Sequence, residues 1–246
     1  MKRNQYINFP DVTDFEEIKN TALIFLNLDY KLIYPTINLI SHPFFDSTGL
    51  TISPNTQKVI NILNGKDELA EATNIFKEEI NRATTISTIY MLLNKPYMLT
   101  FFKYTKDFYS IKDYCEWLSY VWTNSESPNN DVNCSISEIV KWFKAVPIQM
   151  LMNEEELKTY NLLPETLTVY RGVARERNPK GISWTNNKEK AEWFAHRFDN
   201  NDYTGYIYKA EIKKSEILAY YSRMEEYEIV VNVPEKRKFM IDIAYN

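Results

Sequence analysis

The stretch Glu226-Tyr227-Glu228-Ile229-Val230-Val231 joins two carboxylates to an apolar, mostly β-branched run. Such a run predicts a strand, which we place at residues 226–233. Side chains alternate between the two faces of a strand, so Glu226 and Glu228 are expected to point the same way. Like charges that are neighbours on one strand face repel each other. The pair therefore indicates either a solvated strand face or a site that needs both carboxylates.

The pattern of the chain changes near residue 165. Before this point, polar caps followed by apolar residues at helical spacing predict helices at 55–63 and 67–82 and after Ser110, Ser135 and Asn153. After it, β-rich runs predict strands at 166–171, 181–185, 203–212, 216–220, 226–233 and 238–245. One helix is expected among the strands, capped by Asn186 and burying Ala191, Phe194, Ala195 and Phe198.

The order of these elements predicts the α+β class, because the last strands lack the long crossover helices of a parallel sheet. We expect a helical N-terminal region over residues 1–108. A second domain is expected over 109–246, with leading helices at 110–161 and a compact, mostly antiparallel β core at 165–246.

Composition excludes several kinds of site. The chain has 246 residues, a net charge of −4 and only 5 glycines, and it carries neither GxGxxG nor GxxxxGK[ST]. A phosphate-bearing ligand would therefore need side chains to hold it. The 2 histidines and 2 cysteines lack the spacing of metal ligands, so no metal is expected. No apolar segment suggests a signal peptide or a membrane span, so we expect a cytoplasmic protein without a membrane partner.

Two segments earlier in the chain form a pattern together with Glu226 and Glu228. Tyr170-Arg171-Gly172 and Ser183-Trp184-Thr185 precede Glu226-x-Glu228 along the chain. In this order the three motifs resemble the arginine–serine–glutamate class of the ADP-ribosyltransferase superfamily, and in particular its small prokaryotic and phage-associated toxin-type members. The resemblance covers less than a third of the chain, and each motif alone is weakly specific. It implies an ADP-ribosyltransferase-like β core and NAD as the substrate.

The resemblance also implies roles for the carboxylates and the arginine. Glu228 would stabilise the positive charge that develops on the ribose as the bond to nicotinamide breaks. Glu226 would orient the acceptor and take its proton. Arg171 would bind the pyrophosphate with its planar fork of donors, and Gly172 would allow close backbone approach.

The remaining motif residues complete the expected cofactor site. By resemblance, Ser183 braces the catalytic glutamate and Thr185 supports the same strand end. Trp184 and Tyr221 are expected to supply aromatic contacts to the nicotinamide ring. From the residues alone, core packing of Trp184 is an equal alternative.

The spacing between Arg171 and Ser183 departs from many family members, which place a helix there. Only eleven residues separate the two, and they include Pro179 and Gly181, which predict a loop. Either the fold is trimmed at this point, or Arg175 or Arg177 holds the pyrophosphate instead of Arg171.

The expected function is therefore transfer of ADP-ribose from NAD to a macromolecule by an intracellular toxin or defence effector with a neutralising partner. A protein arginine is the favoured acceptor, because arginine-modifying members carry glutamate at the first position of the ExE motif. RNA or DNA as acceptor, and NAD hydrolysis alone, are alternatives within the same fold. A non-catalytic protein that binds a partner through its aromatic-rich helical half is the alternative from another class.

Overall fold

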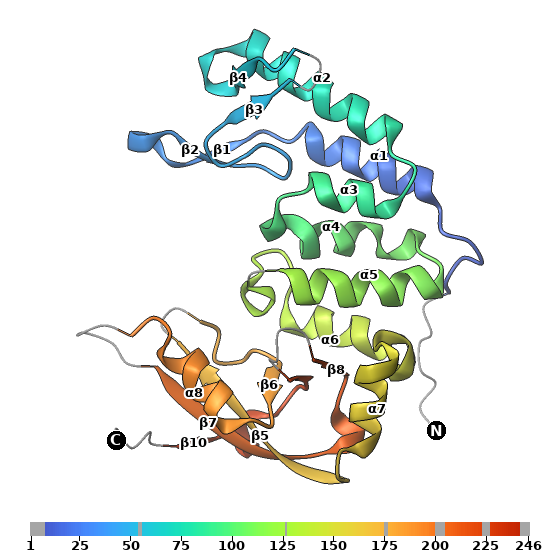
Figure 1. The fold of residues 1–246 in the computed structure, drawn as a ribbon, viewed down its shortest axis with the longest axis vertical. Helices are drawn as coiled ribbons and strands as arrows, with labels where there is room; N and C mark the ends of the chain where they lie inside the picture. Colours follow the sequence, from blue (N-terminus) through green and yellow to red (C-terminus); the bar gives the residue numbers. More distant parts are fainter. Residues whose placement is uncertain are drawn as a thin grey trace. The chain divides into compact units, whose positions relative to one another are not determined.

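The computed structural model describes residues 8–53, 56–125, 127–174, 177–199, 205–222 and 227–241 (Figure 1). It confirms the coarse α+β class, with helices in the first part of the chain and antiparallel sheets. The described residues divide into two compact units. The N-terminal unit holds residues 8–114 with Asn124 and Ser125, and the C-terminal unit holds residues 115–123 and those from 127 onward.

The N-terminal unit combines helices with two short hairpins. Its elements are α1 (Phe15–Leu26), β1 (Lys31–Tyr34), β2 (Leu39–Ser41), β3 (Leu50–Ile52), β4 (Val59–Asn61), α2 (Lys66–Arg82), α3 (Ile86–Leu92) and α4 (Met98–Thr105). Helix α5 (Ile111–Asn124) begins in this unit, and its residues 115–123 belong to the other. No helix in the described part of the chain is both long and apolar enough to cross a bilayer.

The helix predicted at 55–63 is wrong. Residues 59–61 form β4, in which Val59 pairs with Ile52 of β3, and a short 3-10 turn follows at Ile62–Asn64. The β-branched pair Val59 and Ile60 suits a strand better than a helix, and the pairing with β3 makes this preference decisive.

His42 is a buried polar residue in the core of the N-terminal unit. Its side chain is 1 % exposed. Nδ1 accepts the backbone N–H groups of Phe44 and Phe45 at 3.1 Å each, and Nε2 donates to the carbonyl of Leu28 at 3.0 Å. These bonds require the neutral imidazole, and burial lowers the pKa of His42 to about 4.

The C-terminal unit is built on a six-stranded antiparallel sheet in the order β10-β7-β5-β6-β9-β8. Its strands are β5 (Thr166–Val173), β6 (Ser183–Thr185), β7 (Tyr206–Lys213), β8 (Ala219–Tyr221), β9 (Glu228–Val230) and β10 (Phe239–Ile241). Its complete helices are α6 (Ile136–Lys144), α7 (Glu154–Leu162) and α8 (Lys188–His196). The helices predicted after Ser135 and Asn153 are confirmed, and each begins with a capping box. Helix α8 is capped by Asn187 and not by Asn186.

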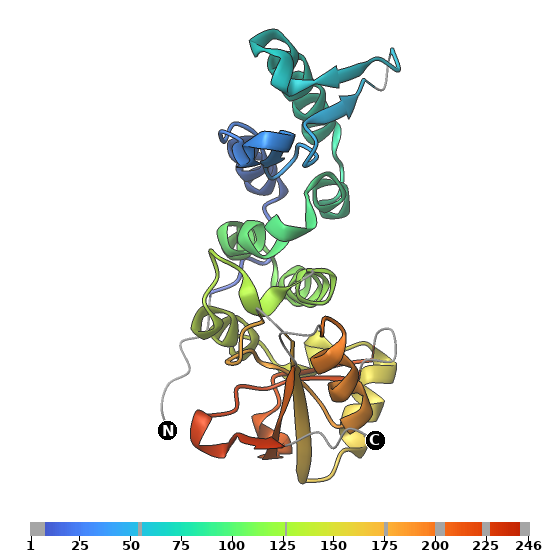
Figure 2. The same ribbon diagram turned by 90° about the vertical axis from the view of Figure 1, so that its left-hand side faces the viewer.

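The sheet has two unlike faces. The core face carries Val169, Trp184 and Ile229, and the partly buried side chains of α7 pack against this cluster. The opposite face, which we call the α8 face, is covered in part by α8, whose alanines 191 and 195 pack with Tyr170 and Ile207. Figure 2 shows α8 lying along the strands of this unit. Residues on neighbouring strands can therefore be assigned to one face or the other from the register.

One prediction of side-chain direction in this unit is wrong, and another concerns a residue that the structure does not describe. Phe198 is 51 % exposed, because α8 ends at His196 and the helical period does not extend to residue 198. Strand β9 begins only at Glu228, and Tyr227 has a φ of 49°, in the left-handed region. The expectation that Glu226 and Glu228 share a strand face stays a prediction, because Glu226 lies outside the described residues.

The N-terminal unit should lose stability as the pH falls from about 6.5 to about 4. The unfolded chain binds a proton on His42 near pH 6.5, whereas the folded unit binds it only near pH 4, so protonation favours the unfolded chain in this window. We expect a loss of about 3 kcal/mol in the free energy of unfolding. Denaturant unfolding of wild type and His42→Asn at neutral pH and at about pH 4 measures it. An identical pH dependence in the two proteins would contradict the assignment.

Candidate active site

The sheet register brings two of the sequence motifs into one row on the α8 face. Thr185 of β6 lies opposite Glu228 of β9, and Glu228 lies opposite Tyr221 of β8. Residues directly opposite each other in antiparallel strands share a face, and so do residues two apart on one strand. Ser183, Thr185 and Glu228 therefore lie on the same face of adjacent strands.

Helix α5 holds the carboxylate of Glu228. The Trp122 indole Nε1 donates to Glu228 Oε1 at 3.1 Å, and Trp122 itself is 1 % exposed. One turn earlier on α5, Ser119 Oγ accepts the hydroxyl of Tyr221 at 3.0 Å. The left-handed residue Tyr227 directly precedes Glu228. The half-buried carboxylate is thus positioned by a rigid aromatic donor that the sequence motifs do not contain.

Ser183 is held by a residue that sequence reasoning did not identify. Asn129 Nδ2 donates to Ser183 Oγ at 2.9 Å, and Asn129 Oδ1 accepts the backbone N–H of Ile182 at 2.7 Å. Asn129 lies in the 3-10 turn Pro128–Asn130, inside a segment whose polar composition predicts only a loop. No local pattern signals this pairing, because the partners are 54 positions apart.

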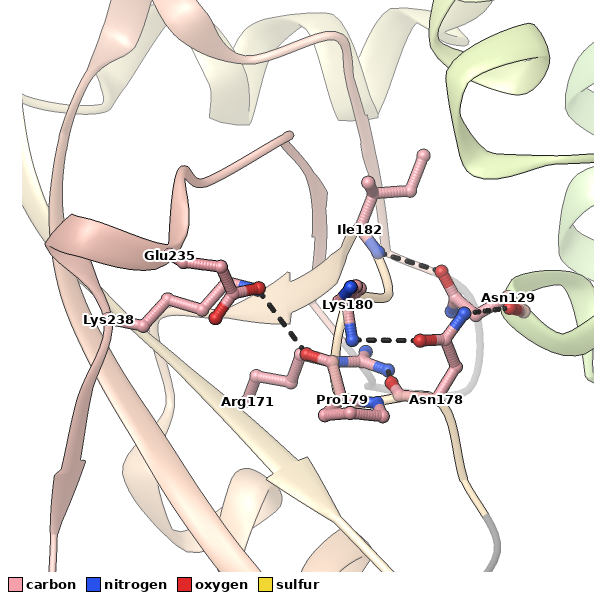
Figure 3. A network of polar contacts seen from close by, with 8 residues as sticks. All are labelled: Asn129, Arg171, Asn178, Pro179, Lys180, Ile182, Glu235 and Lys238. Carbon is pink, nitrogen blue, oxygen red and sulfur yellow. Dashed lines mark hydrogen bonds and ion pairs between the residues drawn. The ribbon is translucent and has the colours of Figure 1, made fainter.

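Arg171 is buried and bound to main-chain carbonyls. It is 7 % exposed, and it donates from Nη1 to the carbonyl of Ser183 at 2.7 Å. Its Nη2 donates to the carbonyl of Asn178, also at 2.7 Å (Figure 3). Strand alternation places it on the core face with Val169 and Trp184. Burial lowers the pKa of Arg171 to about 10 against an opposing contribution from Glu228, so the side chain stays charged at neutral pH.

The loop before Ser183 is fixed from several sides. Asn178 Nδ2 donates to the carbonyl of Asn129 at 2.8 Å, and Lys238 Nζ donates to the carbonyl of Pro179 at 3.3 Å (Figure 3). A Cβ at Gly181 would lie 2.1 Å from Nη2 of Arg171. The described part of this segment, residues 177–182, contains no helix, as the sequence predicts.

Gly172 makes room for a helix. A Cβ at this position would lie 2.0 Å from the carbonyl oxygen of Ala191 and 2.6 Å from the backbone nitrogen of Ala195. The close backbone approach expected at Gly172 is therefore the contact of β5 with α8. Its predicted contact to NAD stays a prediction.

Three other residues that were predicted to bind the cofactor pack against, or hydrogen-bond to, other parts of the protein. Trp184 is 2 % exposed in the core cluster, the placement that favours the core-packing alternative. Tyr221 is also 2 % exposed and bonds to Ser119. Thr185 Oγ1 accepts the backbone N–H of Asn187 at 3.1 Å and so shapes the turn into α8. The predicted contacts of these three residues to a nucleotide stay predictions. On the α8 face, Ser183 and Glu228 are half-exposed, whereas Thr185 and Tyr221 are buried.

Arg177, the described alternative to Arg171, lies beside a pocket of about 420 Å³. The pocket is lined mainly by polar side chains of the 128–136 segment and the 177–178 turn: Asn129, Asn130, Asp131, Cys134, Ser135, Ile136, Arg177 and Asn178. The Arg177 guanidinium donates to Ser127 Oγ at its edge. Arg175 lies outside the described residues.

Comparison with known proteins yields no relative: no family model, no curated protein and no solved structure matches this chain. The ADP-ribosyltransferase assignment accordingly stays a resemblance of three short motifs.

Gly181→Ala should destabilise the C-terminal unit by about 1–3 kcal/mol, the usual cost of overpacking a filled site. The new methyl group would meet the Arg171 guanidinium at 2.1 Å and Asn129 Cγ at 2.8 Å. The neighbouring change Lys180→Ala, at an exposed side chain, should stay within about 0.5 kcal/mol. Denaturant unfolding compares the two variants; equal stabilities would show that Arg171 does not fill the space beside Gly181.

Proposed function

We propose that this protein is an NAD-dependent ADP-ribosyltransferase that transfers ADP-ribose to a macromolecular acceptor and releases nicotinamide. The observation that carries the proposal is the row on the α8 face, in which Ser183 and Thr185 on β6 lie beside Glu228 on β9. Two motifs that are far apart in the sequence thereby present a hydroxyl and a carboxylate on the same face.

Cleavage of the bond between nicotinamide and ribose is stabilised by a negative charge held in a fixed position. When the bond between the nicotinamide nitrogen and the ribose C1′ breaks, its electron pair leaves with nicotinamide and positive charge develops on the ribose. A carboxylate held in place before the substrate arrives stabilises that charge without reorganisation. The Trp122 indole holds Glu228 Oε1 in this way, so Glu228 is assigned the catalytic role and Trp122 a positioning role.

The pyrophosphate needs a different donor from the one that the motif resemblance implies. Both terminal nitrogens of Arg171 are bound to carbonyls of the loop, so Arg171 is assigned the positioning of Ser183. Arg177 lines a pocket of about 420 Å³, and we assign it to the pyrophosphate. The acceptor remains a proposal within this reaction class: protein arginine first, with RNA, DNA or water as alternatives and a neutralising protein as an expected partner.

A non-catalytic, partner-binding protein is the second candidate. It is favoured by the internal engagement of Arg171, Trp184 and Tyr221, which leaves these motif side chains in structural roles. It predicts neither nicotinamide release nor a shift of the melting temperature with NAD.

Glu228→Gln should reduce nicotinamide release by roughly 10²- to 10³-fold, the loss typical of removing one charge-stabilising group. Trp122→Phe keeps an aromatic ring in the core but removes the N–H donor, and we expect roughly a tenfold lower kcat. Chromatography of nicotinamide formed from NAD in the presence of cell lysate measures both. Glu211→Gln, at an exposed position of β7, is the matched control and should behave as wild type.

The same assay separates the candidates. Release that is unchanged in Glu228→Gln would refute the catalytic assignment. If wild type releases no nicotinamide and NAD does not raise its melting temperature, the non-catalytic candidate replaces the enzyme. Labelled NAD followed by protease or nuclease digestion identifies the acceptor class.

A further inference from the structure

Two large aromatic side chains are exposed on and just after α8. Trp193 is 56 % exposed and Phe198 is 51 % exposed. Scattered exposed aromatics are ordinary on protein surfaces. These two differ because cationic side chains lie against their rings, which combines flat apolar surface with positive charge.

The cations are arranged around both rings. Lys190 Nζ and the Arg197 guanidinium each lie 5.7 Å from the Trp193 ring centre. The guanidinium of Arg197 is 4.8 Å from the Phe198 ring, and that of Arg177 is 5.6 Å from it. We call Trp193, Phe198, Lys190, Arg197 and Arg177 the aromatic–basic surface.

Among the described residues of this region the charge is slightly positive, although the whole chain is acidic, with a net charge of −4. Two of the nearby carboxylates are paired, Glu192 with Lys188 at 2.8 Å and Asp199 with His196. Because His196 is counted as neutral, Asp199 and the α8 carboxylate Glu189 together oppose the three cations of the surface. Binding of a charged ligand depends on the local electrostatic field as well as on net charge, so an acidic chain can still bind an anionic ligand at this surface.

We propose that the aromatic–basic surface binds a single-stranded nucleic acid, with bases stacked on Trp193 and Phe198 and backbone phosphates near Lys190 and Arg197. Exposed aromatic side chains beside cations are the groups on which unpaired bases stack without sequence preference. A duplex hides the faces of its bases, so it cannot use the rings. The inference does not rest on the proposed transferase activity; if both hold, a nucleic acid becomes the favoured acceptor.

The test uses the full chain and a fluorescein-labelled oligouridylate of about 12 nucleotides, read out by fluorescence anisotropy. We expect binding that weakens as salt rises from about 50 to 200 mM. Trp193→Ala should raise Kd roughly tenfold, because a stacked base contributes about 1–3 kcal/mol. Trp193→Phe should retain most of the affinity, and Lys190→Ala should weaken binding and lower its salt dependence.

Tyr104→Ala is the control, since Tyr104 is 59 % exposed in the N-terminal unit and belongs to no such surface. The proposal is overturned if wild type does not bind at low salt, or if Trp193→Ala binds as tightly as Tyr104→Ala. It is also overturned if a duplex of equal length binds as well as the single strand. Binding to anionic vesicles or to a protein partner through Trp193, without competition by the oligonucleotide, would assign the surface to that other ligand instead.

Discussion

The guanidinium of Arg171 joins the two halves of the C-terminal sheet. Strand β5 pairs with β7 along its whole length, but its register with β6 consists of the single pair Tyr170–Thr185. We call this short β5–β6 pairing the seam of the sheet. Arg171 of β5 spans the seam by donating to the carbonyls of Asn178 and Ser183. A buried charge is costly unless it is hydrogen-bonded and compensated. Here the two carbonyls bind the terminal nitrogens, and the field of Glu228 offsets part of the cost of burial, which still lowers the pKa of Arg171.

The candidate site depends on this seam. Strand β6 carries Ser183 and Thr185, and it is the strand through which β9 and Glu228 connect to the rest of the sheet. Asn129 fixes the same strand from the other side through Ser183 Oγ and the N–H of Ile182. With Glu228 held by Trp122, the hydroxyl and the carboxylate of the row are positioned by polar contacts from the loop, the 128–130 turn and α5. Such support from surrounding groups is what a pre-organised site requires.

Local patterns predicted the local structure. The capping boxes at Ser135 and Asn153 are encoded within a few residues of sequence, and so are most strands of the C-terminal unit. Sequence patterns predicted the structure wrongly at the ends of helices and strands, where the conformation of single residues determines where an element begins or stops. Strand β9 begins only after the left-handed Tyr227, and the end of α8 leaves Phe198 exposed.

The candidate site was predictable only in part. The motifs pointed to Ser183 and Glu228, and the register places both on one face. Their supporting residues could not be found, because Asn129 and Trp122 lie 54 and 106 positions away from the groups that they bind. The engagement of Arg171 by carbonyls is equally invisible in the sequence, since an arginine at a strand end suits a phosphate as well as a main-chain oxygen.

A crystal structure of the Glu228→Gln variant with NAD tests the account most directly, because reduced turnover should preserve the dinucleotide. The account predicts the nicotinamide ribose on the α8 face beside Ser183 and residue 228, with Arg171 still bound to the carbonyls of Asn178 and Ser183. NAD with its pyrophosphate on Arg171, or crystals grown in saturating NAD that contain none, would contradict it.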